Sequence, residues 1–182
     1  MTTQQIPLPD MSPRILAGKV DTTLSKMRKL HDELNRALRY SPAKDCPYVR
    51  SPHDAADLVM YDMSHLEQEQ FRILLLNNRN RVLSIETIYT STLNSALIRI
   101  AEVFRPAILR SSAAIVLIHN HPSGDPTPSP EDLSITRTLV EAGRILDIDV
   151  LDHIVIGCGC FVSMKERGLG FEGTSSNTVQ LN

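Results

Sequence analysis

Residues 119–132 read HNHPSGDPTPSPED, and they directly follow the apolar run AAIVLI at 113–118. An apolar run of this length is typical of a buried strand. The stretch that follows it allows two interpretations, a turn with a capped helix or a metal site. Ser129, Pro130 and Asp132 resemble a capping box with a proline at the first helical position. The helix interpretation therefore explains Ser129 and Asp132 without any function.

His119 and His121 are not explained by a helix cap. Side chains two residues apart in a strand point to the same face, so we expect the two imidazoles to lie side by side. Neutral imidazoles are good zinc ligands, and a catalytic zinc typically has three protein ligands and a water. Asp132, which the Gly/Pro-rich loop can bring back to the strand end, is the third candidate ligand. The spacing predicts a hydrolytic zinc site, and surface histidines beside a helix cap are the alternative.

The rest of the chain predicts a mixed α/β fold with a central β-sheet flanked by helices. Apolar residues at three- and four-residue intervals predict helices, and apolar runs rich in β-formers predict strands. We expect Pro106 to break or kink the helix that contains it. The expected helices are 20–39, 53–67, 96–110 and 130–146, and the expected strands are the two arms of a hairpin around 77–80, then 113–118, 147–157 and 161–164.

The composition divides the chain into three parts. Residues 1–50 are predicted to form a disordered tail, an amphipathic helix and a proline-rich linker, residues 51–170 the main domain, and residues 171–182 a polar tail. The formal net charge is −2, but residues 1–50 hold nine Lys or Arg against five Asp or Glu. No apolar run approaches the ~20 residues of a membrane span, and the N-terminus lacks a hydrophobic signal core. We expect a cytoplasmic protein without membrane contact.

The histidine stretch also matches a known signature. The order His119-x-His121, seven residues, Ser129, two residues, Asp132 resembles the JAMM motif of JAB/MPN metalloproteases. With LDHIVIG at 151–157 and VFRPAI at 103–108, the chain resembles the bacterial RadC family over about 52–170. The resemblance implies a JAB/MPN-like (cytidine-deaminase-like) fold with zinc bound by His119, His121 and Asp132. It also implies a metallopeptidase that cleaves peptide or isopeptide bonds, in a peptide or protein conjugate, by a metal-activated water.

The resemblance implies two further catalytic residues. The family uses an upstream glutamate, at a helix-to-strand junction, as the general base. Glu69 in EQFRILLL is the best match, and Glu67 and Glu86 are the alternatives. Ser129, at the mouth of the site, would donate a hydrogen bond to the oxyanion of the tetrahedral intermediate.

Four other polar residues have predicted supporting roles. We expect Asn120 to point to the other face of the strand and to tie down the loop. Ser123 and Asp125 belong to the turn. His153, in the middle of VLDHIVI, is expected to be a core residue or a neighbour of the ligands rather than a ligand.

A different class of function is also compatible with the sequence. The amphipathic helix carries Lys26, Arg28 and Lys29, which could contact nucleic acid while the metal is only structural. The protein would then be an accessory factor of DNA repair or of mobile elements. RadC proteins usually carry a helix-hairpin-helix module whose hairpin needs glycines, and no glycine lies between residues 19 and 123. We therefore do not expect that module in this chain, which weakens the case for DNA repair.

Overall fold

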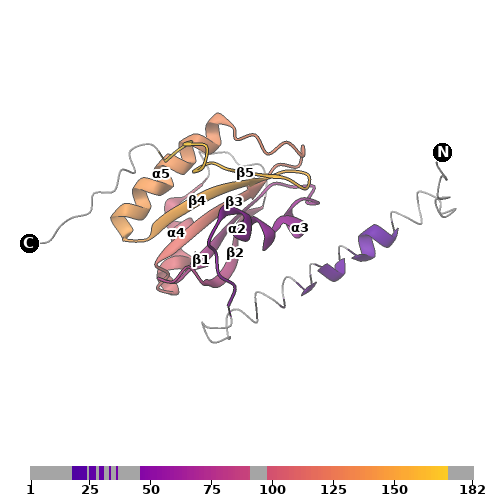
Figure 1. Ribbon diagram of the computed structural model, residues 1–182, viewed down its shortest axis with the longest axis horizontal. Coiled ribbons are helices and arrows are strands. Elements are labelled where there is room, and N and C mark those ends of the chain that lie inside the picture. The colour runs from indigo at the N-terminus through magenta and orange to yellow at the C-terminus, as the bar shows by residue number, and fades with distance from the viewer. Residues whose placement is uncertain are drawn as a thin grey trace, which may run out of the picture.

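The computed structural model of the protein describes residues 46–90 and 98–171 and, near the N-terminus, residues 18–23, 25–27, 29–30, 33 and 36 (Figure 1). The predicted N-terminal tail, the linker before Cys46 and the polar tail beyond residue 171 lie outside these residues. The division of the chain at residues 50 and 170 therefore stays a prediction.

A five-stranded mixed sheet forms the centre of the domain, in the order β2-β1-β3-β4-β5. Among the described strands, β3 and β4 are the only parallel pair, and the other neighbouring strands run antiparallel. The first two strands form the predicted hairpin, in which Asn80 has the positive φ of 54° that asparagine tolerates in tight turns. The strands are β1 (Gln70–Leu76), β2 (Val82–Thr90), β3 (Ala114–Asn120), β4 (Asp149–Ile156) and β5 (Phe161–Ser163).

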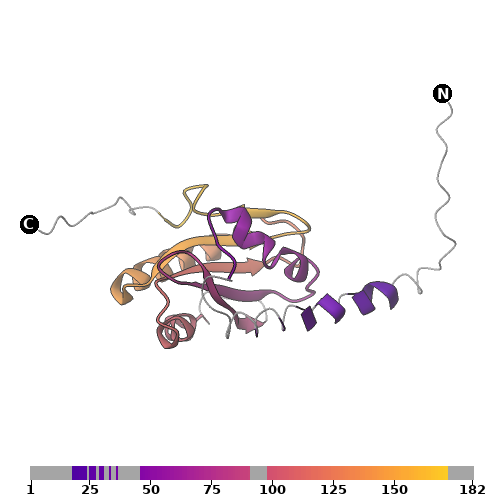
Figure 2. The ribbon, with the colours of Figure 1, turned by 60° about the horizontal axis from the view of Figure 1, so that its bottom comes forward.

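Helices cover both faces of this sheet. One face packs against α2 (Pro52–Asp57) and α3 (Met60–Met63), and the other against α4 (Ile100–Leu109) and α5 (Pro130–Leu146), as Figure 2 shows. In β1, Leu74 and Leu76 belong to the first apolar cluster, whereas Ile73 and Leu75 belong to the second. This is why the run ILLL is apolar without interruption. The predicted fold class, a mixed α/β sheet flanked by helices, is confirmed.

Three element boundaries differ from the sequence expectation. The helix expected over 53–67 is two short helices, because Val59 leaves helical geometry with φ −129°. The helix around Pro106 is not broken: α4 continues to Leu109, and its buried residues Val103, Phe104 and Ala107 anchor it on the sheet. Strand β3 extends past residue 118, so His119 lies inside the strand rather than after it.

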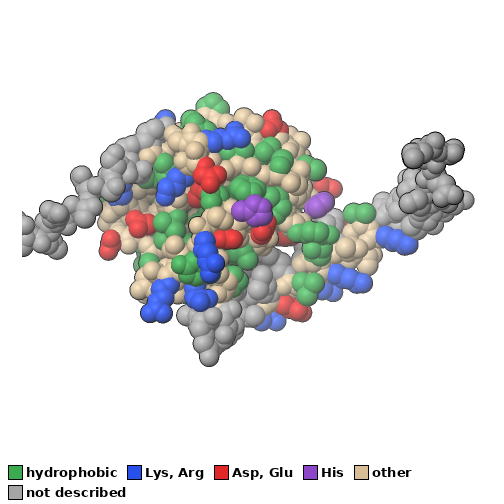
Figure 3. Space-filling model, viewed as in Figure 1, with side chains coloured by type: hydrophobic (Ala, Val, Ile, Leu, Met, Phe, Trp, Pro, Cys, Tyr) green, Lys and Arg blue, Asp and Glu red, His purple; other side chains and the backbone are tan. Residues whose placement is uncertain are grey.

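The described residues between 18 and 36 are helical, as the amphipathic pattern predicted. Among the described residues of this helix, Val20 and Leu30 are 53% and 62% exposed. Charged side chains along this helix are visible in Figure 3. No helix among the described residues is both long enough and apolar enough to cross a membrane.

Candidate metal centre

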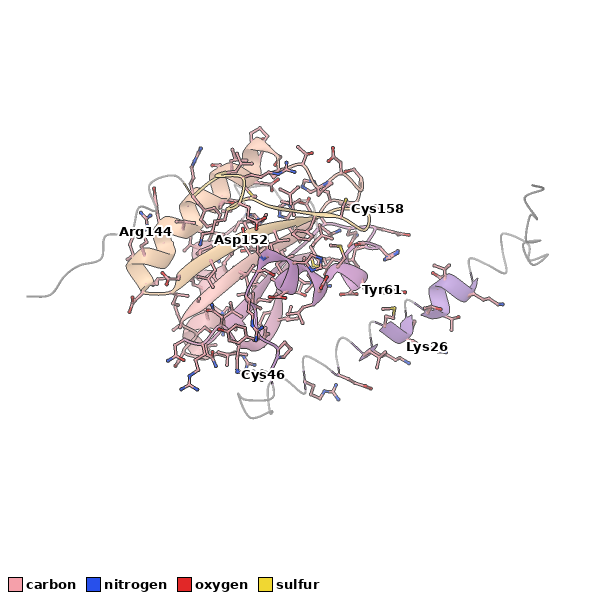
Figure 4. The ribbon with its side chains drawn as sticks, viewed as in Figure 1. Lys26, Cys46, Tyr61, Arg144, Asp152 and Cys158 are labelled. Atoms are coloured by element: carbon pink, nitrogen blue, oxygen red, sulfur yellow. The ribbon has the colours of Figure 1, made fainter. Side chains whose placement is uncertain are left out.

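The two histidines of the HNH stretch lie at one end of the sheet. His119 is the last residue but one of β3, and His121 directly follows the strand. The loop after His121 contacts the β4–β5 turn through a hydrogen bond from Cys158 N to the Gly124 carbonyl. Cys158 marks this end of the sheet in Figure 4, and Arg144, near the end of α5, marks the opposite end.

The structure brings His119, His121 and Asp132 together. The Nε2 atoms of the two histidines are 3.0 Å apart. Asp132 Oδ1 lies 3.2 Å from His119 Nε2, and Asp132 Oδ2 lies 3.6 Å from His121 Nε2. His119 and Asp132 are buried, whereas His121 is half-buried. The three predicted ligands therefore direct their polar atoms to one point, which opens to solvent on the side of His121.

Glu69 approaches the same point from the connection between α3 and β1. One of its carboxylate oxygens and the Nε2 or Nδ1 atoms of His119 and His121 lie within 4.8 Å of one another, a group that can hold a metal ion. The two alternative glutamates are elsewhere: Glu67 is exposed outside this group, and Glu86 on β2 is paired with Arg110 at 3.5 Å. Of the three glutamates considered, Glu69 is the one beside the histidines.

Asp132 also belongs to the capping box of α5, in which Ser129 is the N-cap residue. The Asp132 amide donates to Ser129 Oγ at 3.1 Å, and Asp132 Oδ2 accepts from the Ser129 amide and hydroxyl, both at 2.7 Å. The other oxygen, Oδ1, faces His119. The capped helix and a metal site are therefore compatible, because one carboxylate can take part in both. The Ser129 hydroxyl proton is directed to Asp132 in this structure.

The hydrogen bonds behind His119 determine its tautomer. Thr136 Oγ1 lies 2.5 Å from the Asp132 carbonyl, which can only accept, so the hydroxyl donates there and accepts from His153 Nδ1 at 2.6 Å. Burial lowers the pKa of His153 well below its ordinary value, so its ring is neutral and its Nε2 accepts. That atom lies 2.8 Å from His119 Nδ1, which therefore donates. In the neutral ring the lone pair of His119 is then on Nε2, which faces His121 Nε2 at 3.0 Å and Asp132 Oδ1 at 3.2 Å.

His121 has the same tautomer for a simpler reason. Its Nδ1 lies 2.8 Å from the carbonyl of Asp125, which can only accept, so Nδ1 carries the proton. Two neutral imidazoles would then present lone pairs to each other across 3.0 Å. That arrangement needs a cation between the rings, either a proton on one of them or a metal ion. The donor set therefore fits a metal such as zinc, which binds the neutral imidazole nitrogen.

The close contacts between Asp132 and the two histidines shift the pKa values of His121 and Asp132. A hydrogen bond with Asp132 raises the pKa of His121 above its ordinary value, against the opposing effect of burial. Burial alone would raise the pKa of Asp132, but hydrogen bonds with His119 and His121 outweigh it and hold the pKa well below its usual range. Asp132 is therefore an anion facing two imidazoles, the combination that a divalent cation would meet.

The contacts of Asn120 and Thr136 differ from the sequence expectation. Asn120 does not tie down its own loop: its side chain bonds the backbone of Gln68 and Gln70, on either side of Glu69. Thr136 was not singled out, although its position four residues after Asp132 puts both on one face of α5. His153 contacts His119 and is not itself directed at the metal point, as expected of a neighbour of the ligands.

The sequence of this chain is similar to that of a known protein family. The model of the family described as RadC-like JAB domain matches residues 49–169. The chain belongs to this family. The RadC-like chain is 56% identical to a UPF0758 protein of Roseiflexus castenholzii over 139 residues, which are 76% of this chain and 60% of the relative. It is 52% identical to a UPF0758 protein of Desulforamulus reducens over 137 residues, 75% of this chain and 60% of the relative. The RadC-like chain thus matches about 60% of the length of these relatives.

Proposed function

We propose that the protein is a zinc-dependent hydrolase of the JAMM type, which cleaves peptide or isopeptide bonds. The observation that supports this most is the convergence of three side chains. His119 Nε2 lies 3.0 Å from His121 Nε2, and the Asp132 oxygens lie 3.2 Å and 3.6 Å from these two nitrogens. A zinc ion held there would lower the pKa of a bound water towards about 7 and would polarise the substrate carbonyl group.

His119, His121 and Asp132 would hold the metal, and Glu69 would act as the base. Glu69 also lies within reach of the metal position, so the two carboxylates compete for the role of third ligand. Asp132 is the better ligand, since it is buried and its orientation is fixed by the capping bonds. Glu69 is half-buried, so it can meet both water and substrate. It accepts the proton of the attacking water and then delivers it to the leaving amine.

Ser129 would stabilise the oxyanion that forms on the substrate carbonyl. Its hydroxyl now donates to Asp132 Oδ2, so a rotation about the Cα–Cβ bond is needed before it donates to substrate. Asp132 Oδ2 keeps the bond from the Ser129 amide during this rotation. A donor of this kind contributes on the order of 3 kcal/mol to the transition state.

Elemental analysis and two variants test this function. Protein purified without chelator or affinity-tag metal is expected to carry one zinc per chain, and the double variant His119→Ala/His121→Ala to carry none. Glu69→Gln should keep the zinc and lose hydrolysis of fluorogenic peptides and of lysine isopeptide conjugates. Zinc that survives the double histidine substitution, or full activity in Glu69→Gln, would refute the proposal.

A second candidate is supported by the N-terminal helix. Four cations on its described residues, Lys19, Lys26, Lys29 and Arg36, are exposed, and Lys26 is labelled in Figure 4. On the face of the domain that carries α2 and α3, positive and negative side chains are instead interspersed (Figure 3). Nucleic-acid binding through this helix would weaken as the salt concentration rises. Replacing Lys26 and Lys29 with glutamine would reduce the steepness of the plot of log binding constant against log salt concentration by roughly 1 per lost phosphate contact. Such binding would be indifferent to Glu69→Gln.

A further inference from the structure

We propose that Asn120 is a positioning residue for Glu69: its carboxamide holds the peptide groups on both sides of Glu69 and thereby directs the Glu69 carboxylate toward the metal ligands. The role rests on the proposed function, in which Glu69 accepts the proton of the attacking water. Asn120 itself acts only through the backbone that carries Glu69.

The contacts of Asn120 match the two ends of its amide group. Oδ1 accepts from the Gln70 amide at 2.8 Å, and Nδ2 donates to the Gln68 carbonyl at 3.2 Å. The side chain is 1% exposed, so water does not compete for these bonds. One planar carboxamide thus satisfies a donor and an acceptor that flank a single residue, Glu69. A side chain with only a donor or only an acceptor could make one of the two bonds but not both.

The sheet needs this substitute because its own ladder stops short of Glu69. Pairing between β1 and β3 ends at Phe71 and His119, and the backbone of Asn120 pairs with Ile156 of β4. Glu69 lies one residue before β1, in an irregular connection. The Asn120 side chain continues the β1–β3 ladder to Gln68 and Gln70, where main-chain pairing with β3 has ended.

The position of Asn120 between the two histidines links the base to the ligands. We call the two hydrogen bonds of the Asn120 carboxamide, to Gln68 and Gln70, the clamp. His119, Asn120 and His121 are consecutive, so a shift of this strand end moves the proposed ligands and the clamp together. The Glu69 oxygen then stays within 4.8 Å of the histidine nitrogens. Misplacement of a catalytic group by about 1 Å can lower the rate about 100-fold, which gives the clamp a function beyond holding a turn.

Amide hydrogen exchange in the full chain gives a readout that needs neither metal nor substrate. In Asn120→Ala the Gln70 amide loses its acceptor, so its exchange is expected to accelerate. Asn120→Asp keeps an acceptor for Gln70 and loses the donor to Gln68, so it should preserve Gln70 protection. It also serves as the second variant if Asn120→Ala does not fold. Unchanged Gln70 exchange in Asn120→Ala would overturn the clamp.

Kinetics of the zinc-loaded chain test the role in catalysis. Asn120→Ala should bind one zinc per chain, and with cobalt in place of zinc it should give the absorption spectrum of the wild type. Its kcat should fall about 10- to 100-fold with little change in KM. The matched control is Asn77→Ala, since Asn77 Oδ1 also accepts two backbone amides, Arg79 N and Arg81 N, at the other end of β1. The control should keep the wild-type kcat.

A double variant separates positioning from an independent effect. If Asn120 acts through Glu69, Asn120→Ala should lower the residual activity of Glu69→Gln hardly at all. An equal loss in both backgrounds, or an unchanged kcat in Asn120→Ala, would overturn the inference while leaving the proposed function intact. A zinc-loaded wild type that cleaves no peptide or isopeptide would instead refute the proposed function, and the role of Asn120 in catalysis would fall with it.

Discussion

His119 Nδ1 and His153 Nε2 lie 2.8 Å apart, and this contact determines which nitrogen of His119 faces the metal centre. His153 is buried in β4, beside the strand that carries His119, and receives its own orientation from Thr136 on α5. The orientation of His119 Nε2 therefore depends on residues of β3, β4 and α5.

Replacing His153 tests this orientation. In His153→Phe the Nδ1 proton of His119 loses its acceptor, so we expect zinc affinity to fall about 10- to 100-fold. Competition with a chromogenic chelator measures the affinity. His65→Phe, which changes an exposed histidine bonded only to the Tyr61 carbonyl in this structure, is the control and should bind zinc as the wild type does. Equal affinities in the two variants would contradict the orienting role.

Zinc should stabilise the protein more as pH rises. The raised pKa of His121 means that the metal-free protein gains stability from this group fully below its ordinary pKa of 6.5, and loses it as pH rises through the raised value. Zinc must displace that proton, so its affinity increases with pH over the same window. The increase in Tm on adding zinc should therefore be larger at about pH 8 than at about pH 6. His121→Ala should show no such trend, and a pH-independent increase in the wild type would exclude the mechanism.

Gly157 allows the histidine loop to pack on the β4–β5 turn. A Cβ at this position would collide with the Gly124 carbonyl and would lie 2.8 Å from Pro126 Cδ. Gly157→Ala should therefore displace the loop that bonds His121, lowering both Tm and zinc affinity. Gly159→Ala is the control, because no atom lies within 4 Å of its Cβ. Its positive φ of 68° costs about 1 kcal/mol but should leave zinc affinity unchanged.

The ion pair between Arg72 and Asp62 anchors α3 to β1. Arg72 Nη1 lies 2.6 Å from Asp62 Oδ2, and both side chains are largely buried. Arg72→Met would leave the Asp62 carboxylate without its partner, and the free energy of unfolding should fall by about 3–5 kcal/mol. Urea denaturation measures the loss. The double variant Arg72→Met/Asp62→Leu should recover much of it; failure to recover would show that Arg72 acts mainly through its bonds to Gln70 Oε1.

Local signals in the sequence predicted much of the fold and part of the site. The two-residue period of a strand places His119 beside His121, and the capping box places Asp132 at the start of α5, because both depend on neighbouring residues only. The predicted break at Pro106 was wrong, since the burial of α4 outweighs the hydrogen bond that proline removes.

Pairings between distant strands could not be predicted in the same way. His153 meets His119 only because β4 lies parallel to β3, and Asn120 meets Gln68 and Gln70 only because β1 lies on its other side. No periodicity within one segment specifies which strands are neighbours. The Glu69 assignment depended on the family resemblance for the same reason.

Asp132 takes part in the capping box of α5 as well as in the proposed metal site, and this affects which residues of the site would be substituted first in evolution. A copy of this domain that no longer needed metal would still keep Asp132, because the first turn of α5 depends on its bonds with Ser129. The half-buried His121 holds a loop rather than a helix end, through the contact of its Nδ1 with the Asp125 carbonyl. Family members that no longer bind a metal should therefore be recognised by substitution of His121 rather than of Asp132.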